Sequence, residues 1–583
     1  MDPVVSDLLD KRFRIPSSNE DKTMSLRDAV DRFVRPGDAV HLGLTHTRGG
    51  VAAWEILRRF HRQDPGFTLL GVQLTTPASP LVHAGLVRKV VTSWAGDSYY
   101  APGPSPVYQR AWRDGVEFEH WSILTYVQRL AAAARGLSWA TTRSLAGSTM
   151  ARDNAHAYRE VEPGLGLVSA LVPDVSVVHA VAADRAGNAV LTPPLMENVY
   201  GALAAKRGAI VTVERVVDSS VIRSHSHLVR LPSSCVAAVV EAPLGGHPGG
   251  LSTTGLTGEL ADIEPYGDDY EFWVELREAG RDRDTMDRWI KEWVLDVPSH
   301  EAYRALLGSA RVERLHERGR VEGWREDLEA ALEGADLSAP PTPEERAVVE
   351  AAQLLRLRIR ERGHRTLLAG AGMSNLAAWL AAYSLARVGG PIDLAAEMGL
   401  VGYWPHAGEP MLFNQRNFPT CTMLADIDWT MSILVGGGTA RAIGVLGAAQ
   451  VDRHANLNST LIPGERLLMG SGGANDVATT AEETVVVAVQ TRDRFLEQVP
   501  YVTAPGDRIG TVVTQCGVYE KDADGELALT AVYDEDVEAG VREARERCGW
   551  ALRVAPDVRR ASAPSDQGLL TLRLMDPHGW FRS

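Results

Sequence analysis

The chain has 583 residues and a mass of 63.2 kDa, with 45% hydrophobic and 23% charged residues. This composition is ordinary for a globular protein, and the length is too great for one hydrophobic core, so we expect two to four domains. The formal charge of −15 and the pI near 5.6 argue against partners such as nucleic acids or anionic membranes, because both require a basic surface.

The four cysteines, Cys235, Cys421, Cys516 and Cys548, are scattered and form no CxxC pair. This spacing fits a reducing cytosol and predicts neither a disulfide framework nor a structural metal site. The polar first residues predict no signal peptide. Residues 367–386 are the most apolar stretch, but their glycines and polar residues indicate a buried strand, turn and helix rather than a membrane span. We therefore expect a cytoplasmic protein without membrane segments.

Strand-like runs alternate with helical periodicity along the whole chain, which predicts α/β units around mainly parallel sheets. The clearest boundary lies at residues 320–345, where a charged helical segment ends and Thr342, Pro343 and Glu345 form the expected start of a new helix, with a capping box. The predicted organisation is an N-terminal extension (1–24), a first domain (25–320), a solvated linker (321–345) and a second domain (346–583).

The two halves carry similar features in the same order. Each has a strand, at residues 39–43 and 367–370, followed by a helix that contains Ala-Ala-Trp. Each later has a strand followed by Asp-Arg-x-x-Asn, at residues 184–188 and 452–456. This order predicts an internal duplication, with two similar, open, twisted, mainly parallel sheets fused in one chain. Because loops at the carboxyl ends of parallel strands form ligand sites, we expect the site between the two domains.

Glu397 ends an apolar, strand-like run that begins at Pro391, and Gly399 follows two residues later. Burial of a carboxylate at such a place costs free energy unless the group is hydrogen-bonded or functional. A surface glutamate at a strand end is the alternative interpretation. Glu397 is therefore a candidate catalytic carboxylate.

Glycine-containing loops are further candidates for ligand contact. Residues 470–475 read Gly-Ser-Gly-Gly-Ala-Asn and could present backbone N–H groups to an anion, although a tight turn into a helix is the alternative. A phosphate loop is excluded because no Lys-Ser/Thr pair follows the glycines. Gly370 and Gly372 show the same feature more weakly. Residues 436–438 predict a mobile turn between strands, and His247 is interpreted as a loop residue.

These segments resemble a known family, the family I CoA-transferases, of the glutaconate CoA-transferase type. At residues 394–402, 447–452, 456–460 and 470–475, the second half resembles the nucleophile-bearing subunit. At residues 25–60, 242–248 and 291–296, the first half resembles the other subunit. The resemblance covers roughly residues 24–315 and 346–535, and residues beyond about 535 carry none of it.

The resemblance implies the CoA-transferase fold in both halves and transfer of coenzyme A between an acyl-CoA and a small carboxylic acid. It implies that Glu397 attacks the thioester and carries the coenzyme A as a glutamyl-CoA thioester. Coenzyme A is then a substrate, and we expect no bound cofactor and no metal. We also expect a homo-oligomer, either a dimer or a larger assembly.

The remaining site residues follow from the same resemblance and from loop positions. The oxyanion or CoA-binding candidates are Gly472, Gly473, Ala474, Asn475, Gly370 and Gly372. The substrate-binding candidates are Thr45, Arg48 and Ser98, with Arg48 as a partner for the second carboxylate of a dicarboxylic substrate.

Other functions stay open at this point. Ala396 and Met398 depart from the Ser-Glu-Asn-Gly core of many family members, so the acyl groups are not predicted. One alternative is an acyl-CoA hydrolase, which cleaves a thioester or a C–C bond. A group of steroid-ring-opening hydrolases is also similar to both halves and places its catalytic carboxylate where Ile123 aligns. Isoleucine cannot act as an acid or base. Another is a ligand sensor, but the first 24 residues are too short for a DNA-binding domain.

Overall fold

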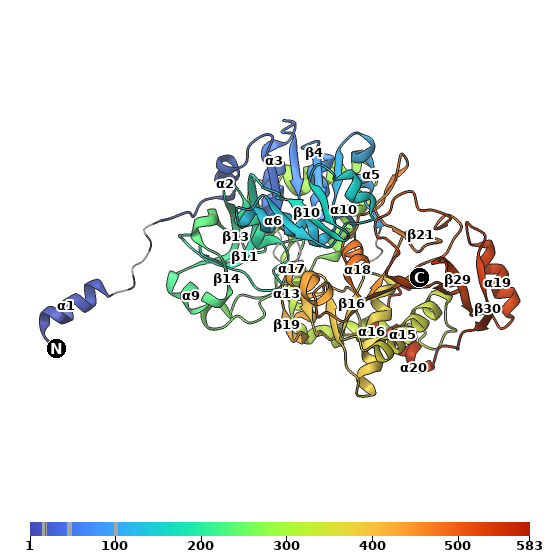
Figure 1. The fold of residues 1–583 in the computed structure, drawn as a ribbon. Helices are drawn as coiled ribbons and strands as arrows, with labels where there is room; N and C mark the ends of the chain where they lie inside the picture. Colours follow the sequence, from blue (N-terminus) through green and yellow to red (C-terminus); the bar gives the residue numbers. More distant parts are fainter. Residues whose placement is uncertain (14, 16–17, 19, 44–48, 98–102, 583) are drawn as a thin grey trace.

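The structure, a computed structural model, describes residues 1–13, 15, 18, 20–43, 49–97 and 103–582. The body of the molecule consists of two α/β halves, each built around one large sheet (Figure 1). Helix α1 (Pro3–Arg12) lies apart from this body at the N-terminus. No helix in the described ranges has the length and hydrophobicity needed to cross a membrane.

The sheet of the first half has parallel strands at its centre. In spatial order its strands are β14 (Val229–Leu231), β12 (Ala189–Val190), β11 (Val175–Asp184), β1 (Ala39–Leu42), β2 (Phe67–Leu70), β4 (Val87–Thr92) and β7 (Glu117–His120), with β13 (Ala209–Val217) and β15 (Val236–Glu241) paired beyond β11. Strand β1 pairs in parallel with β2 and β11. Every residue of β11 is buried, as expected for a parallel strand that is covered on both faces.

Helices connect these strands and continue beyond them. They are α2 (Leu26–Phe33), α3 (Gly50–Phe60), α4 (Ser79–His83), α5 (Pro106–Arg113), α6 (Ile123–Ala134), α7 (Thr149–Asp153), α8 (Asn198–Ala204), α9 (Ser219–Ser224), α10 (Tyr270–Ala279), α11 (Arg283–Ile290), α12 (His300–Leu307) and α13 (Ser309–Gly319). The Ala-Ala-Trp helix predicted in this half is α3, and its Trp54 is buried against Trp289 with ring centroids 5.9 Å apart.

The sheet of the second half is mixed, because it combines parallel with antiparallel strands. In spatial order its strands are β19 (Met423–Leu424), β18 (Leu400–Val401), β17 (Asp393–Ala396), β16 (Thr366–Ala369), β20 (Ala442–Leu446), β25 (Glu483–Val487), β27 (Ile509–Val513), β28 (Gly517–Lys521), β29 (Leu527–Val532) and β30 (Arg553–Arg560). Strands β17, β16, β20, β25 and β27 are parallel to their neighbours in this series. The predicted fold class, α/β with two mainly parallel sheets, is confirmed.

The helices of the second half cover this sheet. They are α14 (Trp324–Leu332), α15 (Pro343–Arg362), α16 (Met373–Arg387), α17 (Ile427–Trp429), α18 (Ala474–Thr480), α19 (Val537–Glu546) and α20 (Asp566–Met575). The predicted capping box is present at the start of α15, where Thr342 and Glu345 cap each other's backbone N–H groups. The Ala-Ala-Trp helix is α16, and its fully buried Trp379 donates to the Tyr403 hydroxyl at 2.8 Å.

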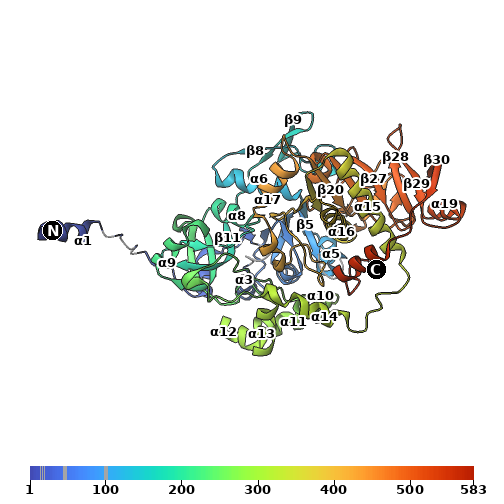
Figure 2. The same cartoon turned by 90° about the horizontal axis from the view of Figure 1, so that it is seen from below.

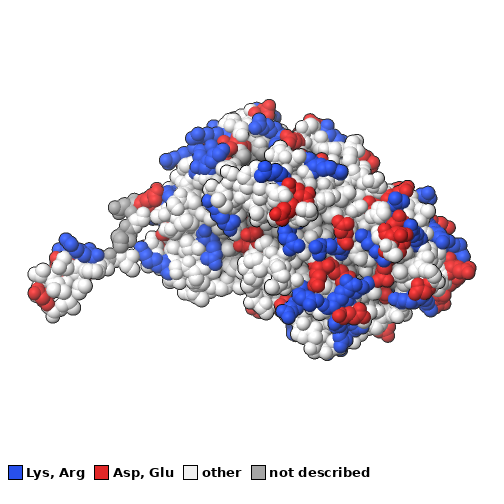
Figure 3. All heavy atoms as spheres, viewed as in Figure 1, with Lys and Arg blue, Asp and Glu red and all other residues white. Residues whose placement is uncertain are grey.

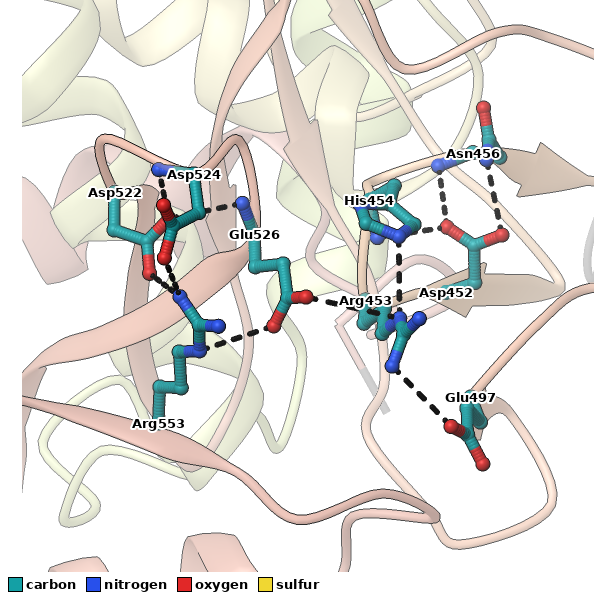
Figure 4. Close-up of polar contacts among 9 residues, drawn as sticks. All are labelled: Asp452, Arg453, His454, Asn456, Glu497, Asp522, Asp524, Glu526 and Arg553. Atoms are coloured by element: carbon teal, nitrogen blue, oxygen red, sulfur yellow. Dashed lines mark hydrogen bonds and ion pairs between the residues drawn. The ribbon is translucent and has the colours of Figure 1, made fainter.

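The two sheets share a topological unit, as the duplication predicted. Strands β1 and β16 each lie between a parallel strand that follows in the chain (β2 and β17) and a later one (β11 and β20). The two Asp-Arg-x-x-Asn motifs form the same turn: Asp184 accepts from the side chain and N–H of Asn188, and Asp452 from those of Asn456. Figure 4 shows the second of these turns beside the ion pairs of Arg453 and Arg553.

Within the described residues, short strands form four smaller sheets and hairpins around the two large sheets. They are β3 (Gln73–Leu74), β5 (Trp94–Asp97) and β6 (Gly103–Pro104); β8 (Trp139–Thr142), β9 (Tyr158–Glu162) and β10 (Leu165–Ser169); β21 (Gln450–Asp452), β22 (Leu457–Asn458) and β26 (Phe495–Leu496); and β23 (Leu461–Ile462) with β24 (Arg466–Leu467). The two halves meet at β5, where Trp94 forms an isolated antiparallel bridge with Gly470 and the Ala95 N–H donates to the Met469 carbonyl at 2.7 Å.

The segment predicted as a linker contains α14, and its residues 321–344 are half-exposed or exposed. Figure 2 shows the chain running through α10 to α14 along one side of the body before it enters α15. Trp324 stacks on His406 at 5.0 Å, and the Glu345 side chain is fully buried. Each of these contacts involves a residue from a distant part of the chain, His406 for Trp324 and Arg573 for Glu345.

The surface carries acidic and basic side chains that are interspersed rather than separated. Figure 3 shows both signs on the face in view, with small groups of each over both halves. A net charge of −15 therefore leaves room for local positive sites.

Candidate active site

A cavity of about 950 Å³ lies between the two halves, at the carboxyl ends of β17, β16, β20 and β25. The second half contributes the residues that follow these strands, including Glu397, and the first half contributes Gln73, Ser93, Trp94 and Ile123. This is the location expected for a ligand site in a duplicated α/β protein.

Glu397 is the first residue of the tight turn between β17 and β18, which pair as an antiparallel hairpin. Gly399 closes this turn with a φ of +114°, and a Cβ atom there would lie 2.5 Å from the Ala425 carbonyl oxygen. Only glycine fits this position. The turn therefore holds Glu397 at the end of a buried strand, with its half-buried side chain at the cavity wall.

Gly473 is the immediate neighbour of the Glu397 carboxylate. A Cβ atom on Gly473 would lie 2.0 Å from Glu397 Oε2, and the Gly473 backbone N–H donates a hydrogen bond to the carboxylate. The preceding loop approaches the first half equally closely, because a Cβ atom on Gly470 would lie 2.1 Å from the Ser93 carbonyl oxygen. The glycines of this loop thus permit two close backbone approaches.

Burial raises the pKa of Glu397 to about 7, the nearby Asp476 carboxylate raises it further, and the Gly473 N–H opposes both. Burial likewise raises the pKa of Asp476, to about 6. A carboxyl group with a raised pKa at a cavity wall, beside a second buried carboxyl group, is typical of an active site, since an ionised carboxylate held there is poorly solvated and more nucleophilic.

Asp476 also connects the two halves. It lies on α18, and its Oδ2 accepts the Leu124 N–H at 3.1 Å, at the start of α6 in the first half. The preceding N–H, that of Ile123, donates to the Gly472 carbonyl at 2.9 Å. A carboxylate at a helix N-terminus is electrostatically favourable. The contacts that join the two halves here therefore also hold Asp476 in position.

The structure distinguishes among the predicted oxyanion donors. The Gly472 N–H donates to the Ser93 carbonyl at 3.1 Å and the Ala474 N–H to the Ser471 carbonyl at 3.0 Å. The Asn475 side chain is fully buried and bridges the Leu145 N–H and the Thr503 carbonyl. Of the predicted loop, Gly473 therefore has the N–H that points to Glu397, and the other three residues hold the loop in place.

The motif at residues 456–460 supports this loop from the other side. Ser459 donates from its hydroxyl to the Gly470 carbonyl at 2.8 Å, and its own carbonyl accepts the Gly470 N–H. Asn458 donates to Gln450 Oε1 at 2.8 Å. The segments that resemble one family in sequence are thus adjacent in space.

Gly370 and Gly372 line the cavity where β16 ends and α16 begins. Gly370 must lack a side chain because a Cβ atom would lie 2.5 Å from the Val445 carbonyl oxygen, whereas Gly372 has a φ of +83° and open space around it. Both glycines leave the start of α16 accessible from the cavity.

The structure places other predicted features elsewhere. His247 is fully buried between the Tyr303 hydroxyl and Asp269, away from the cavity. Residues 436–438 follow a helical turn and precede β20, so the prediction of a turn between two strands is wrong. Thr45, Arg48 and Ser98 lie outside the described residues. Within the described residues, no group of three or more His, Cys, Asp or Glu side chains is placed to hold a metal ion.

Two arginines at the cavity, Arg466 and Arg494, were missed by the sequence analysis. Both side chains are exposed, and neither guanidinium group has a hydrogen-bond or ion-pair partner within the part of the chain that the structure describes. No motif contains them, because β24 and the loop after β25 meet only in the folded protein. Their positive charge offers a site for an anionic group of a ligand.

Comparisons with known proteins agree with this geometry. The model of the family "Coenzyme A transferase" matches residues 23–242 and 429–522, which lie in both halves. One subunit of 3-oxoadipate CoA-transferase from Pseudomonas knackmussii is 30% identical over 299 residues, which are 49% of this chain and 99% of that subunit. The other subunit of the same enzyme is 30% identical over 157 residues, which are 23% of this chain and 58% of that subunit.

One subunit of glutaconate CoA-transferase from Acidaminococcus fermentans is 28% identical over 318 residues, covering 50% of this chain and 93% of that subunit. Among solved structures, an acyl-CoA transferase from Escherichia coli O157:H7 superposes with a TM-score of 0.64 at 15% identity, covering 97% of this chain and 98% of that one. That likeness extends the agreement in fold to almost the whole chain.

Proposed function

Because this chain belongs to the coenzyme A transferase family, with both subunits fused in one polypeptide, we propose that it moves coenzyme A from an acyl-CoA to a small carboxylic acid through a glutamyl-CoA thioester on Glu397. The observation that carries the proposal is the position of Glu397. Its carboxylate faces the cavity between the halves and accepts a hydrogen bond from the Gly473 N–H.

The reaction starts with attack of the Glu397 carboxylate on the thioester carbonyl. The C–S bond breaks, and the products are a mixed anhydride and the coenzyme A thiolate, so the negative charge passes from oxygen to sulfur. The thiolate then attacks the side-chain carbonyl of Glu397 and displaces the donor acid as a carboxylate. A carboxylate nucleophile suits this exchange because each acyl-enzyme product is itself an activated carbonyl. The acceptor acid repeats both steps in reverse.

Each attack at the Glu397 carbonyl places negative charge on its oxygen. In the free protein the Gly473 N–H donates to this carboxylate, and the same N–H is positioned for the oxyanion once Glu397 carries the acyl group or coenzyme A. A preorganised donor of this kind is worth about 3 kcal/mol of transition-state stabilisation. Gly473 is the member of the predicted donor set that this geometry favours.

The cavity also accommodates the rest of coenzyme A. A volume of about 950 Å³ lies at the upper end of the range for ligand sites. Arg466 and Arg494 provide unpaired positive charge for the phosphate groups, and Arg494 follows β25, away from Glu397 along the strand order β17-β16-β20-β25. Binding energy from these remote contacts supports the reaction at the thioester.

Chemical trapping tests the intermediate. Incubation with an acyl-CoA followed by borohydride reduction should modify the peptide that contains Glu397, and Glu397→Gln should abolish both the modification and the exchange of coenzyme A. Release of coenzyme A should require an added carboxylic acid. An unmodified Glu397 peptide in an active enzyme would rule out the proposed intermediate, and rapid release without an acceptor would indicate a hydrolase.

A further inference from the structure

The C-terminal segment, residues 576–582, forms part of the cavity although it lies beyond the residues that match the family model, which end at 522. Helix α20 packs against α15 and α16 and brings the chain back to the site, as Figure 1 shows at the red end of the chain. Trp580 and Phe581 both line the cavity. The last residues of the chain therefore contact the same space as Glu397.

Buried polar contacts hold this segment in one conformation. Asp576 is fully buried, and its carboxylate accepts the backbone N–H groups of Trp580 and Phe581, both at 2.9 Å. Arg573 and Arg582, on either side of this turn, both pair with the buried Glu345 of α15. These contacts hold the backbone that carries the two aromatic residues.

The aromatic residues and Arg494 lie toward opposite ends of the cavity. The loop that carries Leu412 and Phe413 is tied to the start of α16 by a hydrogen bond from Asn375 to the Pro410 carbonyl at 2.8 Å. Phe413 and Trp580 both pack against the cluster formed by Tyr270 and Met411. This end therefore lies beside β16 and β17. Arg494 follows β25, which is separated from β17 by three strand spacings, or about 14 Å.

On this basis we propose that residues 576–582 are a specificity-determining wall, in which Trp580 and Phe581 contact an apolar acyl group of the acyl-CoA. The inference rests on the proposed function, which puts the thioester at Glu397 and the phosphates at Arg466 and Arg494. The acyl group then extends away from Arg494. The described residues at this end, Met373, Leu412, Phe413, Trp580 and Phe581, offer apolar surface to it.

Trp580 also lines a second cavity, of about 440 Å³. That second cavity is lined by charged side chains, among them Asp268, Glu271, Arg314 and Arg318. Loss of the indole ring removes apolar contact area and exposes the part of the cavity that would hold the acyl group to this charged space. An acyl chain that contacts the ring should therefore bind much less well, whereas an acetyl group is too short to contact as much of it.

The experiment compares Trp580→Ala with the wild-type chain on acetyl-, butyryl-, hexanoyl- and benzoyl-CoA, with one acceptor acid held constant. We expect the ratio of kcat/KM for hexanoyl- or benzoyl-CoA to that for acetyl-CoA to fall about tenfold, since each methylene in an apolar pocket is worth roughly tenfold or more. Trp580→Phe should restore most of the ratio. Trp139→Ala, which removes a half-exposed tryptophan outside the cavity, is the matched control and should leave the ratio unchanged.

A second readout separates this inference from the proposed function. Calorimetric titration of the same CoA thioesters into Glu397→Gln, with and without Trp580→Ala, measures selectivity without turnover. If coenzyme A is exchanged and Trp580→Ala affects all four donors equally, or none of them, the specificity-determining wall is overturned and the transferase mechanism stays intact. Absence of exchange together with a selective loss of hexanoyl-CoA binding would support the wall and overturn the mechanism.

Discussion

The carboxylate of Glu397 occupies the space that a side chain on Gly473 would need, since a Cβ atom there would lie 2.0 Å from Oε2. The backbone of Gly473 has φ −81° and ψ −1°, which any residue adopts. Glycine is therefore required at this position by the approach of the carboxylate and not by backbone conformation. A substitution of Gly473 should therefore change the site without changing the fold.

We expect Gly473→Ala to leave the fold intact and to reduce kcat about 100-fold or more, because the methyl group displaces the carboxylate and its hydrogen bond. Steady-state exchange kinetics and circular dichroism measure the two effects. Gly438→Ala is the control, since a Cβ atom at Gly438 meets open space. Near-normal activity of Gly473→Ala would show that Glu397 reacts from another position.

The sequence was sufficient to predict those parts of the fold and site that local patterns specify. The capping box at Thr342, the duplicated Asp-Arg turns and the position of Glu397 after a strand all follow from residues near one another in the chain. The domain limits, the catalytic roles and the homo-oligomer stay predictions.

Other parts of the site depend on contacts between distant segments, which no local pattern reveals. Asp476 approaches Leu124 across 352 residues, and Trp580 reaches the cavity because α20 packs on α15 and α16. Arg466 and Arg494 looked like ordinary surface residues. The hydrogen bonds that already occupy the Gly472 and Ala474 N–H groups could not be predicted either. The acceptor of the Gly472 N–H is the carbonyl of Ser93, in the other half.

The pH dependence of activity should reflect the raised pKa of Glu397, about 7. The nucleophile must be ionised, so kcat/KM should fall about tenfold per pH unit below this value. Asp476→Asn removes a like charge and should move this acidic limb to lower pH, while its amide oxygen can still accept the Leu124 N–H. Asp557→Asn, at an exposed strand position, should not move it. An acidic limb that stays in place in Asp476→Asn would contradict the coupling.

Stability should change with pH in the opposite sense. A carboxyl group whose pKa is raised in the folded state favours folding below the unfolded value, 4.5, and this contribution is lost as the pH rises through about 7. Glu397→Gln avoids the loss, so its melting temperature should exceed that of the wild-type chain by more at pH 8 than at pH 5. Thermal unfolding at both pH values tests this. A difference that is equal at the two pH values would mean that Glu397 has an ordinary pKa.

Arg466 and Arg494 should contribute to affinity for coenzyme A through its phosphates. Because both are exposed, each contact is worth about 1 kcal/mol, or roughly fivefold in the KM for acyl-CoA, and less at high salt. Arg466→Ala and Arg494→Ala should raise KM and change kcat little. Arg88→Ala, an exposed arginine outside the cavity, is the control. If 0.5 M salt leaves the effects undiminished, the contacts are not electrostatic.

Glu345 should be the residue through which the C-terminal segment stabilises the protein. Burial works against its ionisation, but the hydrogen bonds of Arg573 and Thr342 and the charge of Arg582 hold its pKa below the usual value. Glu345→Gln leaves Arg573, which is 5% exposed, without a charged partner, and this should cost about 3 kcal/mol of unfolding free energy. Glu361→Gln, at an exposed position of the same helix, should cost little.

The pH dependence of this loss distinguishes an ion pair from a packing defect. A lowered carboxyl pKa contributes stability above the unfolded value, and the contribution is lost as the pH falls through the folded value. Urea unfolding of Glu345→Gln and the wild-type chain should therefore differ at pH 7 and converge toward pH 3. A constant difference would assign the effect to packing. Because α20 carries the same network to Trp580, the variant should also weaken the preference for longer acyl groups.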